Sequence, residues 1–153
     1  MTENNLKLLE LFDYWLHIRD QYFLAVRAIP DDKLNWKPKG FAQSFAEIIG
    51  NSIKKTYWGL ALVNWNSNLN VRSSDGKNPS KKELVIDLEK SRLRLFTMLA
   101  NLKIEDLSKP VKMDDGQEST LKWLIFYLLE NDIQCRTQIF MLLQMLGIRP
   151  PKI

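Results

Sequence analysis

Residues 120–147 read TLKWLIFYLLENDIQCRTQIFMLLQMLG, and this stretch decides the fold. Only four of its residues are charged, namely Lys122, Glu130, Asp132 and Arg136. One helical stripe can fill a core, and it consists of Leu121, Leu124, Leu128, Cys135, Ile139, Leu142 and Leu146. Five more large apolar residues point elsewhere: Trp123, Phe126, Ile133, Phe140 and Met141. A helix that is apolar nearly all round is usually buried on more than one side, so we expect a central helix ending at Gly147.

Three other helices are expected upstream. Apolar residues recur every three or four positions over residues 5–28, which predicts a first helix. Ser-Phe-Ala-Glu (44–47) and Ser-Lys-Lys-Glu (80–83) fit capping boxes. They predict a second helix from residue 44 to about 65 and a third from residue 80. The buried stripe of the third is expected to be Leu84, Leu88, Leu95, Leu99 and Leu102.

The connections complete the predicted architecture. Residues 30–43 are expected to form a long structured loop, residues 64–78 a flexible crossover, and residues 114–116 a turn. No strand-like alternation is visible in the sequence. The prediction is therefore an all-α fold, a four-helix bundle with a long crossover connection, in one domain over residues 1–153.

The composition excludes several functional classes. The 153 residues include one His and one Cys but 5 Trp, too few ligands for a zinc finger, an Fe–S protein or a multi-His metal site. The net charge is +4, and the lysine pairs 54–55 and 81–82 lie among acids, so we expect no nucleic-acid binding. The N-terminus lacks a secretory pattern, and the longest apolar run is far shorter than the roughly 20 residues that span a bilayer. A soluble, cytoplasmic protein without a membrane partner is expected.

Candidate chemistry lies where polar residues interrupt the core stripe of the last helix. Asn131 and Cys135 are four residues apart, a spacing by which bundles build metal sites. An amide is a poor ligand for a transition metal, so the plainer interpretation is a hydrogen-bonded core amide beside a small buried thiol. Glu130 and Asp132 are expected to flank the stripe. His17 lies on the polar face of the first helix and is interpreted as a surface residue.

Several segments resemble the DinB-like (YfiT-like) proteins. LENDIQCRTQ (129–138), followed by LGIRPP (146–151), is similar to the last helix of that family, which reads approximately His-Glu-x-His-His-Arg-Gly-Gln. DDKLNWKP (31–38) resembles the family's first loop. Residues 44–57 resemble its second helix, whose Glu-Ile/Leu-x-x-His motif falls on residues 47–51.

This resemblance implies a four-helix bundle, commonly a homodimer, that carries a divalent metal such as Zn or Ni held by three His. It also implies metal-dependent hydrolase or thiol-transferase chemistry. The three ligand positions fall on Asn51, Asn131 and Cys135, and none of them is His. We therefore expect no cofactor and no functional transition-metal site.

Three functional hypotheses follow. The first is a dimeric binding or scaffolding protein with a small-molecule pocket formed by Asn51, Asn131, Cys135 and Trp36, its homodimer contact being the apolar residues 123, 126, 133, 140 and 141. The second is an enzyme that uses Cys135 as a nucleophile or in an atypical metal site. The third is a nucleic-acid or membrane-surface adaptor that uses the lysine pairs with Trp58 and Trp65.

Overall fold

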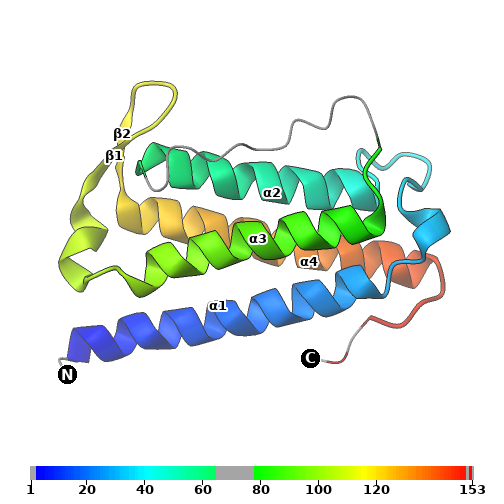
Figure 1. Ribbon diagram of the computed structural model, residues 1–153, viewed down its shortest axis with the longest axis horizontal. Helices are drawn as coiled ribbons and strands as arrows, with labels where there is room; N and C mark the ends of the chain where they lie inside the picture. Colours follow the sequence, from blue (N-terminus) through cyan, green and yellow to red (C-terminus); the bar gives the residue numbers. More distant parts are fainter. Residues whose placement is uncertain (1–2, 65–77, 151, 153) are drawn as a thin grey trace.

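The computed structural model describes residues 3–64, 78–150 and 152 and consists mainly of four long helices (Figure 1). They are α1 (Glu3–Arg27), α2 (Phe45–Leu62), α3 (Lys81–Ala100) and α4 (Leu121–Met145). Helices α1 and α4 run in one direction, and α2 and α3 run in the other (Figure 1). The predicted all-α four-helix bundle is confirmed.

Short polar side chains begin three of the helices. The hydroxyls of Ser44, Ser80 and Thr120 accept hydrogen bonds from the backbone N–H three residues later, at N···O distances of 3.1–3.2 Å. At the end of α4, Gly147 has φ +76°. Its N–H bonds to the carbonyl of Gln144, and the N–H of Ile148 bonds to that of Leu143, both at 2.9 Å. This pair of bonds is the Schellman arrangement, so the predicted glycine C-cap is confirmed.

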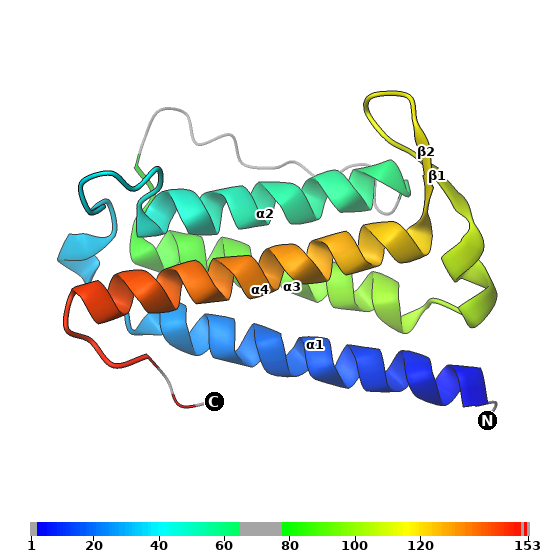
Figure 2. The ribbon, with the colours of Figure 1, turned by 180° about the vertical axis from the view of Figure 1, so that it is seen from behind.

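Helix α2 is shorter than predicted. It ends at Leu62, and Asn64 adopts a left-handed conformation with φ 54°. The predicted crossover falls mostly on residues 65–77, which lie outside the described residues, as does Trp65. The described helices agree with a long connection, because α2 and α3 point in the same direction and their ends to be joined lie far apart (Figure 2).

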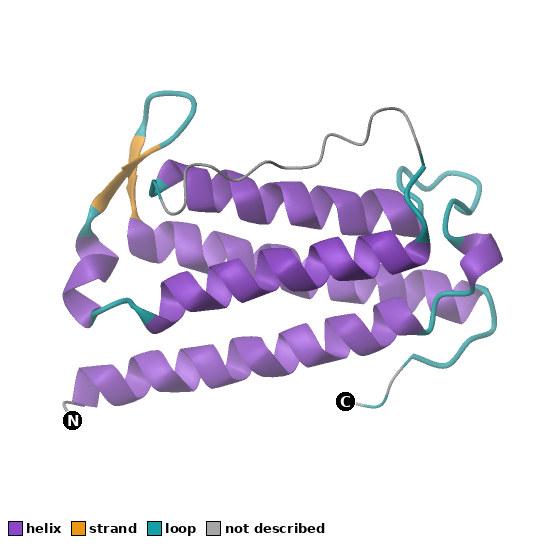
Figure 3. Cartoon of the chain, viewed as in Figure 1, coloured by secondary structure: helices purple, strands orange, loops and turns teal. Residues whose placement is uncertain are grey.

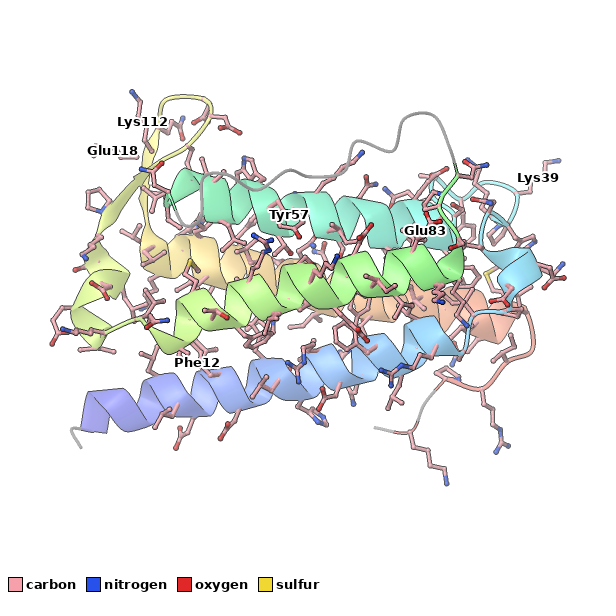
Figure 4. The ribbon with its side chains drawn as sticks, in the orientation of Figure 1. Phe12, Lys39, Tyr57, Glu83, Lys112 and Glu118 are labelled. Atoms are coloured by element: carbon pink, nitrogen blue, oxygen red, sulfur yellow. The ribbon has the colours of Figure 1, made fainter. Side chains whose placement is uncertain are left out.

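A small hairpin corrects the prediction that the chain has no strands. Strands β1 (Pro110–Lys112) and β2 (Glu118–Thr120) pair antiparallel at one end of the bundle (Figure 3). Lys112 and Glu118 are cross-strand partners, and Figure 4 labels both. The predicted turn at residues 114–116 connects the strands, with Gly116 at φ +83°. Three residues per strand are too few to show an alternation, which is why the pattern was not recognisable.

The core consists of two apolar clusters arranged along the bundle. One surrounds Tyr22, Phe45, Leu88 and Ile139, and the other surrounds Trp15, Leu60, Leu95 and Leu124. Tyr57, seen between α2 and α3 in Figure 4, packs against both. The predicted α3 stripe is buried except for Leu102, which lies beyond the helix end and is half-buried. Two short 3₁₀ turns, η1 (Asp31–Lys33) and η2 (Ile104–Ser108), lie in the connections. Within the described residues, none of the helices combines the length and apolar character needed to cross a membrane.

Candidate functional site

A pocket of about 540 Å³ lies between α2 and α4, which run side by side on the face seen in Figure 2. Its α2 lining includes Asn51, Ser52, Lys54, Lys55 and Trp58, and its α4 lining consists of Asn131, Gln134, Cys135 and Gln138. Gln43 and Ile48 complete the lining. This volume falls within the roughly 300–1,000 Å³ that small-molecule sites usually have.

Three of the four pocket residues expected from the sequence line this pocket. Cys135 is buried, Asn131 is half-buried and Asn51 is exposed. Trp36 is not among the lining residues. It lies in the loop before α2 and packs on Phe45, with 6.2 Å between the ring centroids.

Behind the pocket, an ion pair connects α3 to α4 inside the bundle. The Arg92 guanidinium donates to the Asp132 carboxylate at 2.5 Å, and the two side chains are 1% and 2% exposed. The second carboxylate oxygen accepts the indole N–H of Trp15 on α1 at 2.9 Å. The network therefore joins three helices through one carboxylate.

Ser52 connects this network to the pocket. Its hydroxyl oxygen accepts from Arg92 at 2.8 Å and from the Tyr22 hydroxyl at 3.1 Å, and Ser52 also lines the pocket. Arg92 donates a further bond to the Thr56 hydroxyl at 2.5 Å. Burial raises the pKa of Tyr22 far above its usual range, so this phenol remains a neutral donor. The charged Arg92 and the neutral Tyr22 therefore both donate to the hydroxyl of Ser52, which belongs to the pocket lining.

The pocket lining also contains a lysine that lies among aromatic rings. The Lys55 ammonium donates to the Tyr127 hydroxyl at 2.8 Å and lies 4.8 Å from the centroid of that ring. It also lies 5.9 Å from the Trp58 ring. The Trp58 indole N–H donates to Asp114 in the hairpin loop at 2.6 Å. Both the lysine and the indole are therefore held in position by contacts with other elements.

Comparisons with known proteins agree with this architecture. The family model of the DinB superfamily matches residues 15–139. The chain belongs to the DinB superfamily. Among solved structures, a DinB-like protein from Bacillus cereus ATCC 10987 is similar, with a TM-score of 0.77 and 12% identity over 93% of this chain and 94% of that one. A DinB-like protein from Bacillus subtilis has a TM-score of 0.74 and 14% identity over 94% and 96%. A search among curated proteins returned no significant match.

The donor atoms at the position of the expected DinB metal do not fit a divalent transition metal. Asn51 and Asn131 offer neutral amide oxygens, which are weak ligands for such ions. Burial, and to a smaller extent the neighbouring Asp132, raises the pKa of the Cys135 thiol to about 11. Cys135 is the only lining residue with a sulfur or imidazole donor, and a single thiol does not replace three imidazoles. No group of three His, Cys, Asp or Glu side chains is placed to hold a metal anywhere in the described residues.

The position of Asp132 corrects the sequence analysis, which placed it beside the core stripe. Asp132 is buried, and Asn131, expected in the core, is instead half-buried at the pocket wall. A helical phase count could have found this, because Asp132 follows Leu128 by four residues and precedes Cys135 by three. The signal was missed because a lone carboxylate is rarely buried, and its partner Arg92 is 40 residues away in the sequence.

The remaining candidates lie outside the pocket or at its edge. His17 is exposed on α1, as predicted. Trp58 is half-buried and hydrogen-bonded, and it lines the pocket instead of standing free on the surface. Arg136 donates to Gln21 on α1 at 2.5 Å and does not line the pocket.

Proposed function

We propose that this DinB superfamily member binds a small organic molecule in the α2–α4 pocket and acts as a binding or scaffolding protein without a metal. One observation carries the proposal. The three positions where the family resemblance implies metal ligands meet in one pocket, and there they present two amides and a single thiol. Such groups form hydrogen bonds and apolar contacts with a ligand, but they do not supply a Lewis acid.

Two measurements on the purified protein test this proposal. We expect elemental analysis to find less than stoichiometric metal, and Zn²⁺, Ni²⁺ and Mn²⁺ to leave the melting temperature unchanged. Stoichiometric metal together with a large thermal stabilisation by one of these ions would overturn the proposal.

A ligand screen tests whether small molecules bind in the α2–α4 pocket. Fragments that bind by ligand-observed NMR are expected to lose binding in Gln134→Trp, which places a bulky ring at an exposed lining position. The matched control is Gln144→Trp, an exposed residue of α4 outside the lining. Fragments that bind both variants equally would show that the binding site is elsewhere.

The alternative, a hydrolase or thiol transferase that uses Cys135, has weaker support. A nucleophilic cysteine needs a lowered pKa, and the pKa of Cys135 is raised. The single His of the chain lies on the exposed face of α1 and does not line the pocket.

We also propose a homodimer through α4. Trp123, Phe126 and Met141 are 46–47% exposed, although each is large and apolar. Ile133 and Phe140, from the same expected surface, are half-buried against the core clusters. We expect the same helix of a second copy to cover the exposed part of this surface, because a symmetric dimer buries one patch against itself.

A further inference from the structure

We propose that the α2–α4 pocket selects an organic anion, namely a carboxylate joined to a planar apolar group. This inference rests on the proposed binding function and specifies the ligand's chemistry. Three features of the lining support it: its charge, the fixed position of one lysine, and the carboxamides beside an indole ring.

The charge of the lining is positive. Lys54 and Lys55 line the pocket, and no Asp or Glu of the described residues does. Neither lysine forms an ion pair with a carboxylate of another described residue. The buried carboxylate of Asp132 is paired with Arg92, and the carboxylate of Asp114 accepts the Trp58 indole N–H at 2.6 Å. A ligand anion therefore meets two cations and no competing negative charge from this lining, which favours it over a cation of the same shape.

Lys55 is already ordered before a ligand arrives. Its ammonium uses one donor on the Tyr127 hydroxyl at 2.8 Å and lies against the rings of Tyr127 and Trp58. An ammonium has three N–H donors, so two remain for a ligand. A side chain that is fixed in advance loses less entropy on binding, and Lys55 is accordingly the stronger of the two anion contacts.

Carboxamides and one indole form the rest of the recognition surface. Five amides line the pocket: Gln43, Asn51, Asn131, Gln134 and Gln138. None of their side chains forms a hydrogen bond with another described residue, so each can donate to a carboxylate oxygen. Trp58, oriented by its bond to Asp114, offers an aromatic surface, and Ile48 adds an apolar one. A planar apolar group next to the carboxylate fits these two residues.

A matched set of probes tests the charge selection by calorimetry or ligand-observed NMR. Indole-3-acetate, indole-3-acetamide and tryptamine share one ring and differ in charge, being anionic, neutral and cationic at pH 7. We expect indole-3-acetate to bind at least about tenfold more tightly than the amide, and tryptamine not to bind detectably. Acetate alone, which lacks the planar group, should not compete with indole-3-acetate.

Variants assign the selectivity to the lysines. Lys55→Gln should weaken indole-3-acetate by about tenfold and leave the amide unchanged, and Lys54→Gln should have a smaller effect in the same direction. Lys82→Gln is the control, because Lys82 is exposed on α3 and does not line the pocket. Melting curves confirm that each variant is folded.

The outcomes separate the inference from the proposed function. Equal binding of the acetate and the amide, or no change in Lys55→Gln, overturns the anion selectivity and leaves a metal-free binding protein. Failure of all three probes, with other fragments binding in a Gln134-dependent way, also overturns the ligand class alone. Stoichiometric metal in the purified protein overturns the proposed function whatever the probes do.

Discussion

Removing the negative charge of Asp132 is the sharpest test of the buried network. Asp132→Asn keeps the size of the side chain, and its amide oxygen can still accept the Trp15 N–H. It leaves the Arg92 guanidinium, 1% exposed, without a counter-charge. Breaking a buried ion pair on one side typically costs about 3–5 kcal/mol, because an uncompensated charge remains inside the protein.

The expected size of the effect can be converted into a denaturation midpoint. A loss of about 4 kcal/mol, divided by a urea m-value of about 2 kcal/mol/M, lowers the midpoint by about 2 M. Urea unfolding followed by circular dichroism measures both the midpoint and m. An unchanged m would show that the loss belongs to the native network and not to a more compact unfolded state.

Two further variants control for charge and burial. Asp20→Asn removes an exposed carboxylate that pairs with Arg19 at 3.1 Å, and a surface pair of this kind contributes roughly 0–1 kcal/mol. The double variant Arg92→Met/Asp132→Leu should be more stable than Asp132→Asn, since no unpaired charge stays buried. A midpoint for Asp132→Asn within about 0.5 M of the native value, no lower than that of Asp20→Asn, would refute the reasoning.

Three other predictions concern single residues. Iodoacetamide should modify native Cys135 about 100-fold more slowly than the unfolded chain at pH 7, since its pKa rises from 9.0 to about 11, and mass spectrometry measures this. Equally fast labelling of the native and the unfolded protein would contradict this expectation. Because the folded state favours the neutral thiol, the contribution of Cys135 to stability is complete below pH 9.0 and is lost as the pH rises toward about 11. Gly147→Ala should cost about 1–2 kcal/mol because φ is +76°, whereas Gly50→Ala, in helical backbone with open space, should stabilise by up to about 1 kcal/mol; thermal unfolding should give opposite signs. Phe126→Glu should convert the proposed dimer to a monomer by light scattering, while Leu93→Glu, an exposed apolar residue on α3, should not; a monomeric native protein would rule the dimer out.

The helices could be predicted because their signals are local. Ser44 and Ser80 each cap a helix by accepting the backbone N–H three residues later. The buried residues Leu84, Leu88, Leu95 and Leu99 repeat with the helical period. Both signals can be recognised within a short stretch of sequence. The hairpin could not be predicted in the same way. Its strands are only three residues long, and they are defined by their pairing across a turn. Such a pairing produces no periodic pattern in the sequence.

The pocket was predictable in part, and the reason is geometric. Asn51, Asn131 and Cys135 meet because α2 and α4 are neighbours, and the family resemblance supplied that long-range information. Trp36 has no comparable constraint, since a loop side chain can pack in many directions, and here it packs on Phe45. The partners of Lys55 and Asp132 lie 72 and 40 residues away, beyond the reach of any local pattern.

The buried Arg92–Asp132 ion pair is better explained by its effect on the geometry of the pocket than by a contribution to stability. A buried pair of charges contributes little net stability compared with apolar residues of the same size, because both ions lose their hydration. The arrangement does constrain geometry, since Arg92 must reach Asp132 on α4 and Ser52 on α2 at once, at 2.5 and 2.8 Å. A rotation of either helix would break one of these bonds. Ser52 on α2 lines the same pocket as Cys135 and Asn131 on α4. The network therefore fixes the position of α2 relative to α4 at the pocket. The double variant Arg92→Met/Asp132→Leu would keep the bundle folded but leave α2 and α4 free to shift, and ligand affinity should then fall more than stability does.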